Sequence, residues 1–190
     1  MKIGLFFGSF NPIHVGHLII ANTMATTTDL EQVWFVVSPQ NPFKKAKSLL
    51  HAFDRMDMVE QAISDNSKLK ATDIEFSMPK PSFTIDTLIR LQEKHPQHQF
   101  RLIMGEDNLE QFAAWKNPTQ ILELFGLYVY PRPNAVKSEL VTHSGVQLVE
   151  APLLDISATF IRDCIRQNRS IRYLVPEVVE EMIVRKKFYL

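Results

Sequence analysis

Residues 8–17 of this chain read Gly-Ser-Phe-Asn-Pro-Ile-His-Val-Gly-His, and they follow a short apolar run from Lys2 to Phe7. A second apolar run, residues 18–21, comes directly after them and continues as a helix. A strand, a glycine-containing loop and a helix in this order point unsatisfied N–H groups and the positive end of the helix dipole at whatever lies above the strand. The stretch therefore predicts an anion site in an open α/β sheet, where ligands bind at the carboxyl ends of the strands.

Two histidines, His14 and His17, stand three positions apart in this stretch. They would lie on the same side of the first helical turn, where they can donate hydrogen bonds to neighbouring phosphate oxygens. Two other interpretations compete: a structural histidine, or two corners of a metal site. The sequence holds a single cysteine and no second Cys/His cluster to complete such a site. Phosphate binding is therefore the favoured interpretation.

The rest of the chain alternates short runs rich in Val, Ile and Phe with segments of helical period, which is typical of a parallel sheet covered by helices. One helical face is predicted for Phe53, Met56, Val59 and Ile63, and another for Ile85, Leu88 and Ile89. The sequence thus predicts an α/β fold. The candidate strands are residues 2–7, 32–37, 70–76, 100–104, 126–130 and 146–150.

The character of the sequence changes after Pro152, where two helical patterns follow one another. No repeat, Gly/Ser linker or domain boundary is evident, and about 100 to 200 residues is the usual size of one domain. We therefore expect residues 1–190 to form a single domain, with a small C-terminal helical extension at about residues 155–190.

Composition and charge narrow the class of protein. The 190 residues carry 21 Lys and Arg against 21 Asp and Glu, so no overall positive field favours nucleic acid or an acidic membrane. The hydrophobic fraction of 45% suits a folded globule. No run approaches the roughly 18 to 20 apolar residues of a membrane span, and no signal segment is evident. With Cys164 as the lone cysteine, we expect a cytoplasmic protein without disulfides.

A second motif, Asp155-Ile156-Ser157-Ala158-Thr159-Phe160-Ile161-Arg162, places cap-forming residues immediately before an apolar-periodic helix. Taken alone, it predicts a helix N-cap with an arginine on the solvent face.

Together, however, the two motifs resemble the G-x-F-[DN]-P-x-H-x-G-H and I-S-[ST]-[ST]-x-[IV]-R signatures of the nucleotidyltransferase superfamily. The resemblance implies a Rossmann-like, doubly wound, mainly parallel sheet and transfer of a nucleotidyl group from ATP or CTP. The sequence departs from the signatures at two positions. Phe7 stands where many relatives have glycine, and Ala158 replaces a hydroxyl.

Four further segments bear on the acceptor, and each also has a plain structural interpretation. Residues 38–45 form a basic loop after the second predicted strand, residues 82–88 start a helix, residues 104–109 lead to Trp115, and residues 130–133 hold Arg132 in a turn. Such features can bind phosphate, a carboxylate, a flat heterocycle and an anion, respectively. The alternatives are a solvated loop, a helix cap, a core tryptophan and an ordinary turn.

Read together, these segments resemble the nicotinate mononucleotide adenylyltransferase family from Lys2 to about Arg172. The resemblance implies two sets of residues. Those around ATP are Gly8, Ser9, Phe10, His14, His17, Gly105, Asp107, Ser157, Thr159 and Arg162. Those around the nicotinate nucleotide are Asn41, Lys44, Phe83, Thr84, Trp115 and Arg132. Phe83 stands where relatives often have tyrosine.

The chemistry implied is attack by the acceptor phosphate on ATP, with His17 as the principal group that stabilises the transition state. His14, Lys44 and Arg162 would assist, and Mg²⁺ would be bound mainly through the ATP phosphates. The partners expected are ATP and nicotinate mononucleotide, without nucleic acid or membrane, and a homo-oligomer is left open. The alternatives are a sister enzyme such as phosphopantetheine adenylyltransferase or a glycerol-phosphate cytidylyltransferase, and a nucleotide-sensing or metal-binding module without catalysis. A class I aminoacyl-tRNA synthetase is disfavoured because no K-M-S-K-S segment is present.

Overall fold

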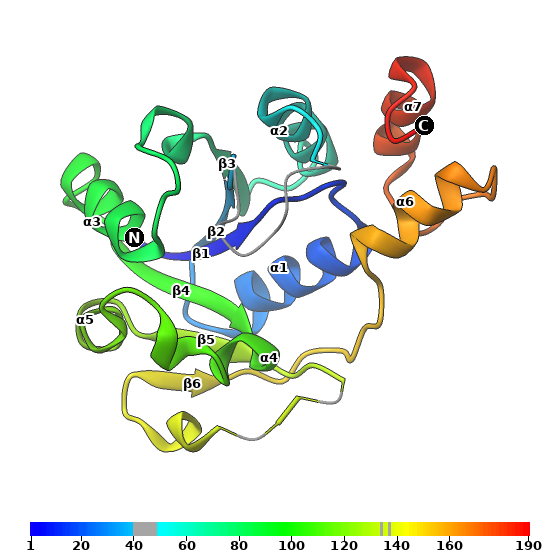
Figure 1. Cartoon of the computed structure of the whole chain (residues 1–190). Coiled ribbons are helices and arrows are strands. Elements are labelled where there is room, and N and C mark those ends of the chain that lie inside the picture. The colour runs from blue at the N-terminus through cyan, green and yellow to red at the C-terminus, as the bar shows by residue number, and fades with distance from the viewer. Residues whose placement is uncertain (40–48, 134, 137) are drawn as a thin grey trace.

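A six-stranded parallel sheet forms the centre of the structure (Figure 1), a computed structural model that describes residues 1–39, 49–133, 135–136 and 138–190. The strand order is β3-β2-β1-β4-β5-β6, and each neighbouring pair runs parallel. This is the doubly wound order of Rossmann-like sheets. The strands are β1 (Lys2–Gly8), β2 (Gln32–Val37), β3 (Leu69–Thr72), β4 (Gln99–Gly105), β5 (Leu127–Tyr130) and β6 (Val146–Leu148).

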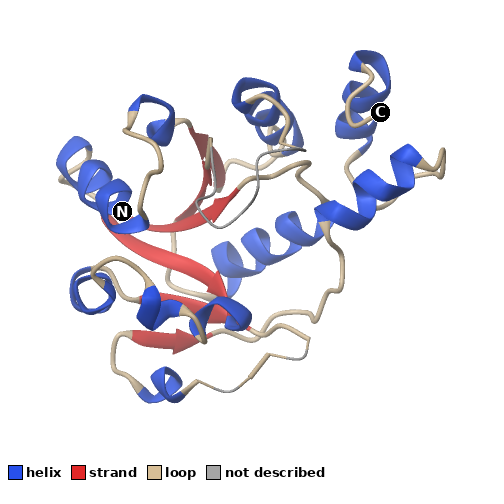
Figure 2. Cartoon of the chain, in the orientation of Figure 1, coloured by secondary structure: helices blue, strands red, loops and turns tan. Residues whose placement is uncertain are grey.

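Helices cover both faces of the sheet, as Figure 2 shows. One face is covered by α1 (Val15–Thr27) and α2 (Ala52–Ala62), and the C-terminal helices α6 (Ala158–Arg166) and α7 (Glu177–Lys186) join the same core. The opposite face is covered by α3 (Thr84–Lys94), α4 (Glu106–Leu109) and α5 (Pro118–Leu124). The predicted α/β class and the C-terminal helical part are confirmed.

The alternation of side chains along the strands separates two cores. Phe6 and Phe35 pack with the core that α1 and α2 share, whereas Leu5 and Trp34 pack with the core under α3 and α5. Successive residues of a strand point to opposite faces. Strands buried on both faces therefore read as nearly continuous apolar runs, as the sequence of β2 does.

Five of the six predicted strands match the structure within two residues at each end, whereas the strand predicted at residues 70–76 is wrong in its second half. There β3 ends at Thr72 and a 3₁₀ helix, Ile74–Ser77, follows. The N–H groups of Phe76 and Met78 donate to the carbonyls of Asp73 and Glu75, three residues back, so the backbone turns here instead of extending the strand.

The predicted buried face of α2 is also partly wrong. Phe53 is 60% exposed and lies against Phe76 at the surface. The buried positions of this helix are Arg55, Met58 and Val59. An arginine, expected among the solvent-facing polar residues, thus occupies part of the core face. In the described part of the chain, no helix combines the length and apolarity that crossing a membrane requires.

Candidate active site

The candidate site lies at the carboxyl ends of β1 and β4, the two central strands. At this point the strand order reverses, since β2 and β3 lie beyond β1 while β5 and β6 lie beyond β4. Connections leave such a switch point in opposite directions and open a crevice for ligands. Gly8 ends β1 and Gly105 ends β4, so both predicted glycines border this crevice.

The first motif forms a tight loop before α1. Phe10 has a positive φ of 44°, and the Asn11–Pro12 peptide bond is cis. The Phe10 ring is 2% exposed and packs edge-on against Phe35. A Cβ atom at Gly8 would lie only 2.7 Å from that ring, so the close approach requires glycine here. The Phe10 side chain is thus part of the core and does not face the crevice.

His14 and His17 come together as the sequence predicts. His14 is the N-cap of α1 and His17 lies three residues further on, with the two rings stacked at a centroid distance of 3.6 Å. The backbone N–H of His14 donates to Nδ1 of His17 across 3.3 Å, and the His17 ring also packs edge-on against Phe10 at 5.0 Å. These contacts orient both imidazoles at the positive end of the helix dipole.

Burial determines the charge of His14. The side chain is buried, and this desolvation, together with the positive charge of Arg132, lowers the pKa of His14 from 6.5 to about 4. His14 is therefore a neutral imidazole at pH 7. It can donate a hydrogen bond to a phosphate oxygen, but it contributes no positive charge of its own at that pH.

The second motif reaches the first through Arg162. Ser157 is the N-cap of α6, and its hydroxyl accepts a hydrogen bond from the Phe160 N–H at 3.2 Å. One turn further, Arg162 donates from Nη1 to the carbonyl of Asn11 at 2.8 Å and from Nη2 to the Thr159 hydroxyl at 3.1 Å. Two segments 151 residues apart in the sequence thus form one cradle of N–H donors.

Arg132, which follows β5, connects the end of β4 to the same cradle. Arg132 packs over Gly105, where an added Cβ would lie 2.9 Å from its side chain, and its Nε lies 3.8 Å from a carboxylate oxygen of Asp107. Arg132 also donates to the carbonyl of Leu154 at 3.2 Å, just before the second motif. The arginine predicted for the acceptor side thus contacts residues predicted for the nucleotide side.

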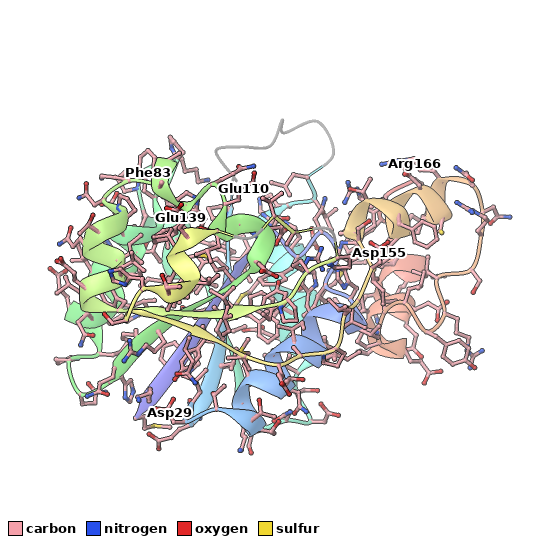
Figure 3. All side chains as sticks on the ribbon, turned by 90° about the horizontal axis from the view of Figure 1, so that it is seen from below. Asp29, Phe83, Glu110, Glu139, Asp155 and Arg166 are labelled. Atoms are coloured by element: carbon pink, nitrogen blue, oxygen red, sulfur yellow. The ribbon has the colours of Figure 1, made fainter. Side chains whose placement is uncertain are left out.

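Two of the other predicted acceptor residues, Phe83 and Thr84, lie at the start of α3. Phe83 is the N-cap, 40% exposed, and Thr84 is the first helical residue. Lys116 lies over the Phe83 ring at 5.0 Å and pairs with Asp86 of α3 at 2.8 Å, while the neighbouring Trp115 packs against Phe112 at a ring distance of 5.4 Å. In Figure 3, Phe83 lies far from Asp29, which precedes β2 at the amino ends of the strands. The predicted residues Asn41 and Lys44 lie outside the described residues.

Sequence reasoning missed Arg55, which holds the loops of the site in place. Its side chain is fully buried, and its Nε and Nη2 donate to the carbonyls of Leu50 at 2.9 Å and Pro39 at 3.2 Å. Its Nη1 donates to the carbonyls of Ser38, at 2.8 Å, and Ser9. Burial lowers the pKa of Arg55 to about 10, so it remains a cation at neutral pH. A helical pattern gives no sign that a polar residue will be buried by two loops.

Glu75 is a second buried group that the sequence did not reveal. Its carboxylate accepts a hydrogen bond from the Thr87 hydroxyl of α3 at 2.8 Å, and burial raises its pKa while the hydroxyls of Thr87, Ser38 and Ser82 oppose the shift. Ser38 follows β2 and Ser82 precedes Phe83. Through its hydrogen bond with Thr87, Glu75 connects the 3₁₀ helix after β3 to α3.

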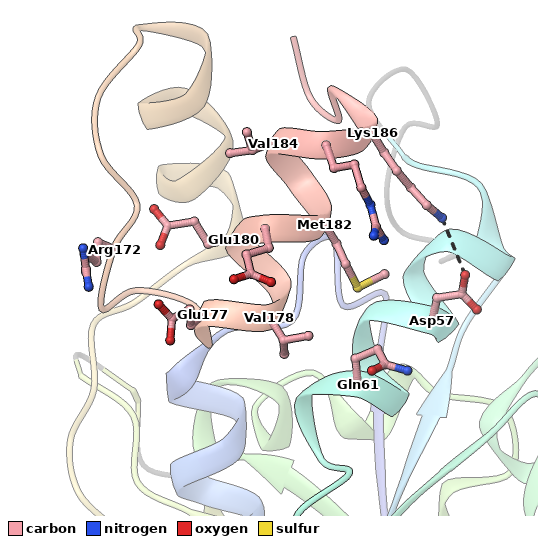
Figure 4. A pocket seen from close by; sticks show the side chains of 11 residues that line it. Asp57, Gln61, Arg172, Glu177, Val178, Glu180, Met182, Val184 and Lys186 are labelled. Carbon is pink, nitrogen blue, oxygen red and sulfur yellow. Dashed lines mark ion pairs between the residues drawn. The ribbon is translucent and has the colours of Figure 1, made fainter.

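A cavity of about 780 Å³ lies elsewhere, between α2 and α7 (Figure 4). Its walls carry charges of both signs, including Asp57 and Lys186, which pair across 3.6 Å. None of the predicted site residues lines it. The strand ends, not this cavity, are the candidate active site, because the glycines, stacked histidines and helix N-termini converge there.

Comparison with known proteins identifies the class of protein to which the chain belongs. Residues 5–164 match the cytidylyltransferase-like family. The fold agrees with that of a nicotinic acid mononucleotide adenylyltransferase from Plasmodium falciparum solved in complex with NaAD, at a TM-score of 0.84 and 21% identity over 99% of this chain and 97% of that one.

Relatives in curated collections narrow the class. A protein from Cytophaga hutchinsonii named "Probable nicotinate-nucleotide adenylyltransferase" is 66% identical over 100% of this chain and 98% of its own length. A protein of the same name from Flavobacterium psychrophilum is 48% identical over 100% of this chain and 99% of its own. The chain belongs to the nicotinate-nucleotide adenylyltransferase family, as its motifs predicted.

Proposed function

We propose that the protein transfers the adenylyl group of ATP to nicotinate mononucleotide, giving nicotinate adenine dinucleotide and pyrophosphate in NAD biosynthesis. The observation that carries the proposal is the hydrogen bond from Arg162 to the Asn11 carbonyl, which joins the two nucleotidyltransferase motifs into one cradle. The family relationship supports the same reaction.

The reaction needs two anions in line rather than a strong base. An oxygen of the acceptor phosphate, largely dianionic at pH 7, attacks the α-phosphorus of ATP. A new P–O bond forms to that phosphorus, and its bond to the bridging oxygen of the β-phosphate breaks, so pyrophosphate leaves with the electron pair. Catalysis then consists of positioning the two substrates and stabilising the extra negative charge at the α-phosphate.

The residues have distinct proposed roles in this step. His17 is the principal donor to the α-phosphate in the transition state, and neutral His14 holds a phosphate of ATP by a hydrogen bond. Arg162 supplies positive charge beside the N-terminus of α6. Lys44, outside the described residues, is proposed to meet phosphate from the loop after β2.

The donor set suits Mg²⁺ carried by ATP. The groups converging on the cradle are mainly imidazoles, the guanidinium groups of Arg162 and Arg132 and helix N–H groups, which complement phosphate oxygens, while the one carboxylate placed there, Asp107, is paired with Arg132. Mg²⁺ usually keeps several waters and binds substrate phosphates with few protein ligands. We therefore propose that it enters with the nucleotide and neutralises charge on the phosphate oxygens.

On the acceptor side, the N-terminus of α3 at Thr84 favours a carboxylate over a neutral amide. Phe83 and Trp115 offer aromatic faces for the pyridine ring. We accordingly propose a preference for nicotinate over nicotinamide mononucleotide. Equal turnover of the two nucleotides would contradict this assignment.

The deciding experiment is pyrophosphate release from purified protein supplied with Mg²⁺, either ATP or CTP, and one acceptor at a time. Nicotinate mononucleotide with ATP should give the highest kcat/KM. Faster turnover of phosphopantetheine with ATP, or of glycerol phosphate with CTP, would identify a sister transferase instead. Nucleotide binding without pyrophosphate release from any pair would favour a sensing module.

Compartment and assembly are proposed on separate grounds. Cys164 is a buried free thiol, which fits the reducing environment of the cytoplasm. We propose that the substrates are small nucleotides without nucleic acid or membrane, since the net charge is zero. Sedimentation at several protein concentrations tests whether a homo-oligomer forms.

A further inference from the structure

The last residues of the chain fold back onto the core after α7. Lys187 ends α7 in the left-handed conformation, with φ of 53°, and the N–H of Phe188 donates to the carbonyl of Ile183 at 3.0 Å. A left-handed residue of this kind reverses the chain at a helix end. Phe188 and Tyr189 are thereby turned back onto the core, and both pack against the same apolar cluster as α1 and α2.

The end of α7 is attached to the helix that carries Arg55. Lys186 pairs with Asp54 at 2.9 Å and with Asp57 at 3.6 Å, the latter contact being drawn in Figure 4. Both carboxylates belong to α2 and flank Arg55 in sequence. The C-terminus is therefore brought beside the arginine that organises the loops after β1 and β2.

The Tyr189 hydroxyl occupies an unusual electrostatic position. Burial raises the pKa of this phenol, whereas the positive charges of Arg55 and Arg162 both act on it in the opposite direction. The group is therefore a neutral hydroxyl at pH 7, close enough to both guanidinium groups to feel their charge. Leu190, the next residue, is 82% exposed, so the chain leaves the interior immediately afterwards.

Two complementary atoms lack a hydrogen-bond partner in this region, where Tyr189 packs against the apolar cluster that includes Ile161, the residue before Arg162. Within the part of the chain that the structure describes, Tyr189 Oη and Arg162 Nε are both buried and unpaired. Nε is a donor and a phenol oxygen accepts, so each can satisfy the other. Buried polar groups without a partner are uncommon and costly, so both atoms have hydrogen-bonding capacity that this state of the protein leaves unused.

Arg162 has its other two nitrogens committed to the site, because Nη1 and Nη2 bind the Asn11 carbonyl and the Thr159 hydroxyl. A hydrogen bond at Nε would fix the remaining edge of the planar guanidinium. The orientation of the Arg162 guanidinium toward a bound phosphate would then depend on Tyr189.

We propose that Tyr189 is a positioning residue of the nucleotide site, whose hydroxyl accepts a hydrogen bond from Arg162 Nε when ATP is bound. It acts through Arg162 and does not contact the nucleotide. The inference rests on the proposed function in taking ATP as the ligand. It goes further by making the C-terminal tyrosine part of nucleotide binding.

The test removes one oxygen atom. Tyr189→Phe keeps the ring in the core, and Tyr173→Phe is the matched control because Tyr173 is 83% exposed on the segment between α6 and α7. Binding of a non-hydrolysable ATP analogue is measured by calorimetry, with KM for ATP and for the acceptor alongside. We expect Tyr189→Phe to weaken the analogue and raise KM for ATP by about 5-fold, the effect of one lost hydrogen bond, and to leave acceptor KM unchanged. Unchanged analogue affinity, or equal losses for both substrates, would overturn the proposal.

A double-mutant cycle separates positioning from general loosening of the fold. Arg162→Lys removes Nε, so adding Tyr189→Phe in that background should change analogue affinity by less than about 1.5-fold. The same loss in both backgrounds would overturn the proposal, even if Tyr189→Phe also lowered the melting temperature. Analogue binding needs no acceptor. Failure to release pyrophosphate with nicotinate mononucleotide would therefore break the proposed function and leave this inference standing.

Discussion

The nucleotide side and the acceptor side of the site are built from different contacts. On the nucleotide side, two arginines donate to backbone carbonyls of the loops, and one of them, Arg55, is fully buried. On the acceptor side, an ion pair between Lys116 and Asp86, each more than 40% exposed, joins the start of α3 to the tryptophan segment. Buried charge-assisted hydrogen bonds stabilise far more than exposed ion pairs do.

This difference indicates that the nucleotide side must be rigid, whereas the acceptor side can vary. The transition state of nucleotidyl transfer develops at the triphosphate, and preorganised donors there cost no rearrangement during the reaction. The acceptor needs binding and orientation, which weaker surface contacts supply. A chain of this design can change its acceptor at little cost in stability, whereas changes in the nucleotide cradle affect both folding and catalysis.

The strongest test of the rigid side is Arg55→Met. It leaves the carbonyls of Ser9, Ser38, Pro39 and Leu50 without this donor, and we expect the free energy of unfolding to fall by about 3 to 5 kcal/mol. Urea unfolding measures this fall in the free energy of unfolding. Arg90→Met, at an exposed position of α3, is the matched control and should change stability by less than about 0.5 kcal/mol. A loss below about 1 kcal/mol for Arg55→Met would show that the loops do not depend on this cation.

Removing the His17 imidazole tests catalysis on the same side. We expect His17→Ala to lower kcat by about 10² to 10³, the effect of losing one transition-state donor, with little change in acceptor KM. Steady-state pyrophosphate release gives both constants. His51→Ala, at an exposed position before α2, should retain full activity. A decrease of less than a few-fold in His17→Ala would mean that another group stabilises the α-phosphate.

The burial of His14 predicts a pH effect on stability. Its pKa is about 4 in the folded protein and 6.5 when exposed, so the unfolded chain binds the extra proton between these values. The free energy of unfolding should therefore fall as pH drops from 6.5 to 4, by up to about 3 kcal/mol from this residue. Urea unfolding of His14→Asn should show a weaker decline than wild type over that window. Parallel curves for the two proteins would contradict the burial of a neutral imidazole.

The smallest effect is expected on the acceptor side. Lys116→Met removes an exposed ion pair and the contact of the cation with the Phe83 ring, so stability should change by less than about 1 kcal/mol. KM for the acceptor should rise by about 2- to 5-fold while KM for ATP stays constant. A large loss of stability, or an equal rise in both KM values, would remove the contrast between the two sides.

Local sequence predicted most of the fold, and its failures are instructive. The strands and helices were visible because their apolar periods are local properties. The end of β3 was wrong because Glu75 is buried through Thr87 of α3, a contact that no local pattern contains. Arg55 was missed for the same reason, since its carbonyl partners come from loops up to 46 residues away.

For the site, the sequence by itself determined the two motifs, the pairing of His14 with His17 on one helical turn and the family. Tertiary structure decided the strand order that places β1 beside β4, the lowered pKa of His14, and the hydrogen bond between Arg162 and Asn11. The physical reason is the separation in sequence of the residues that interact. Motifs and helical turns depend on neighbours in sequence, whereas desolvation and the contact between a loop and a helix 151 residues apart depend on how the whole sheet packs.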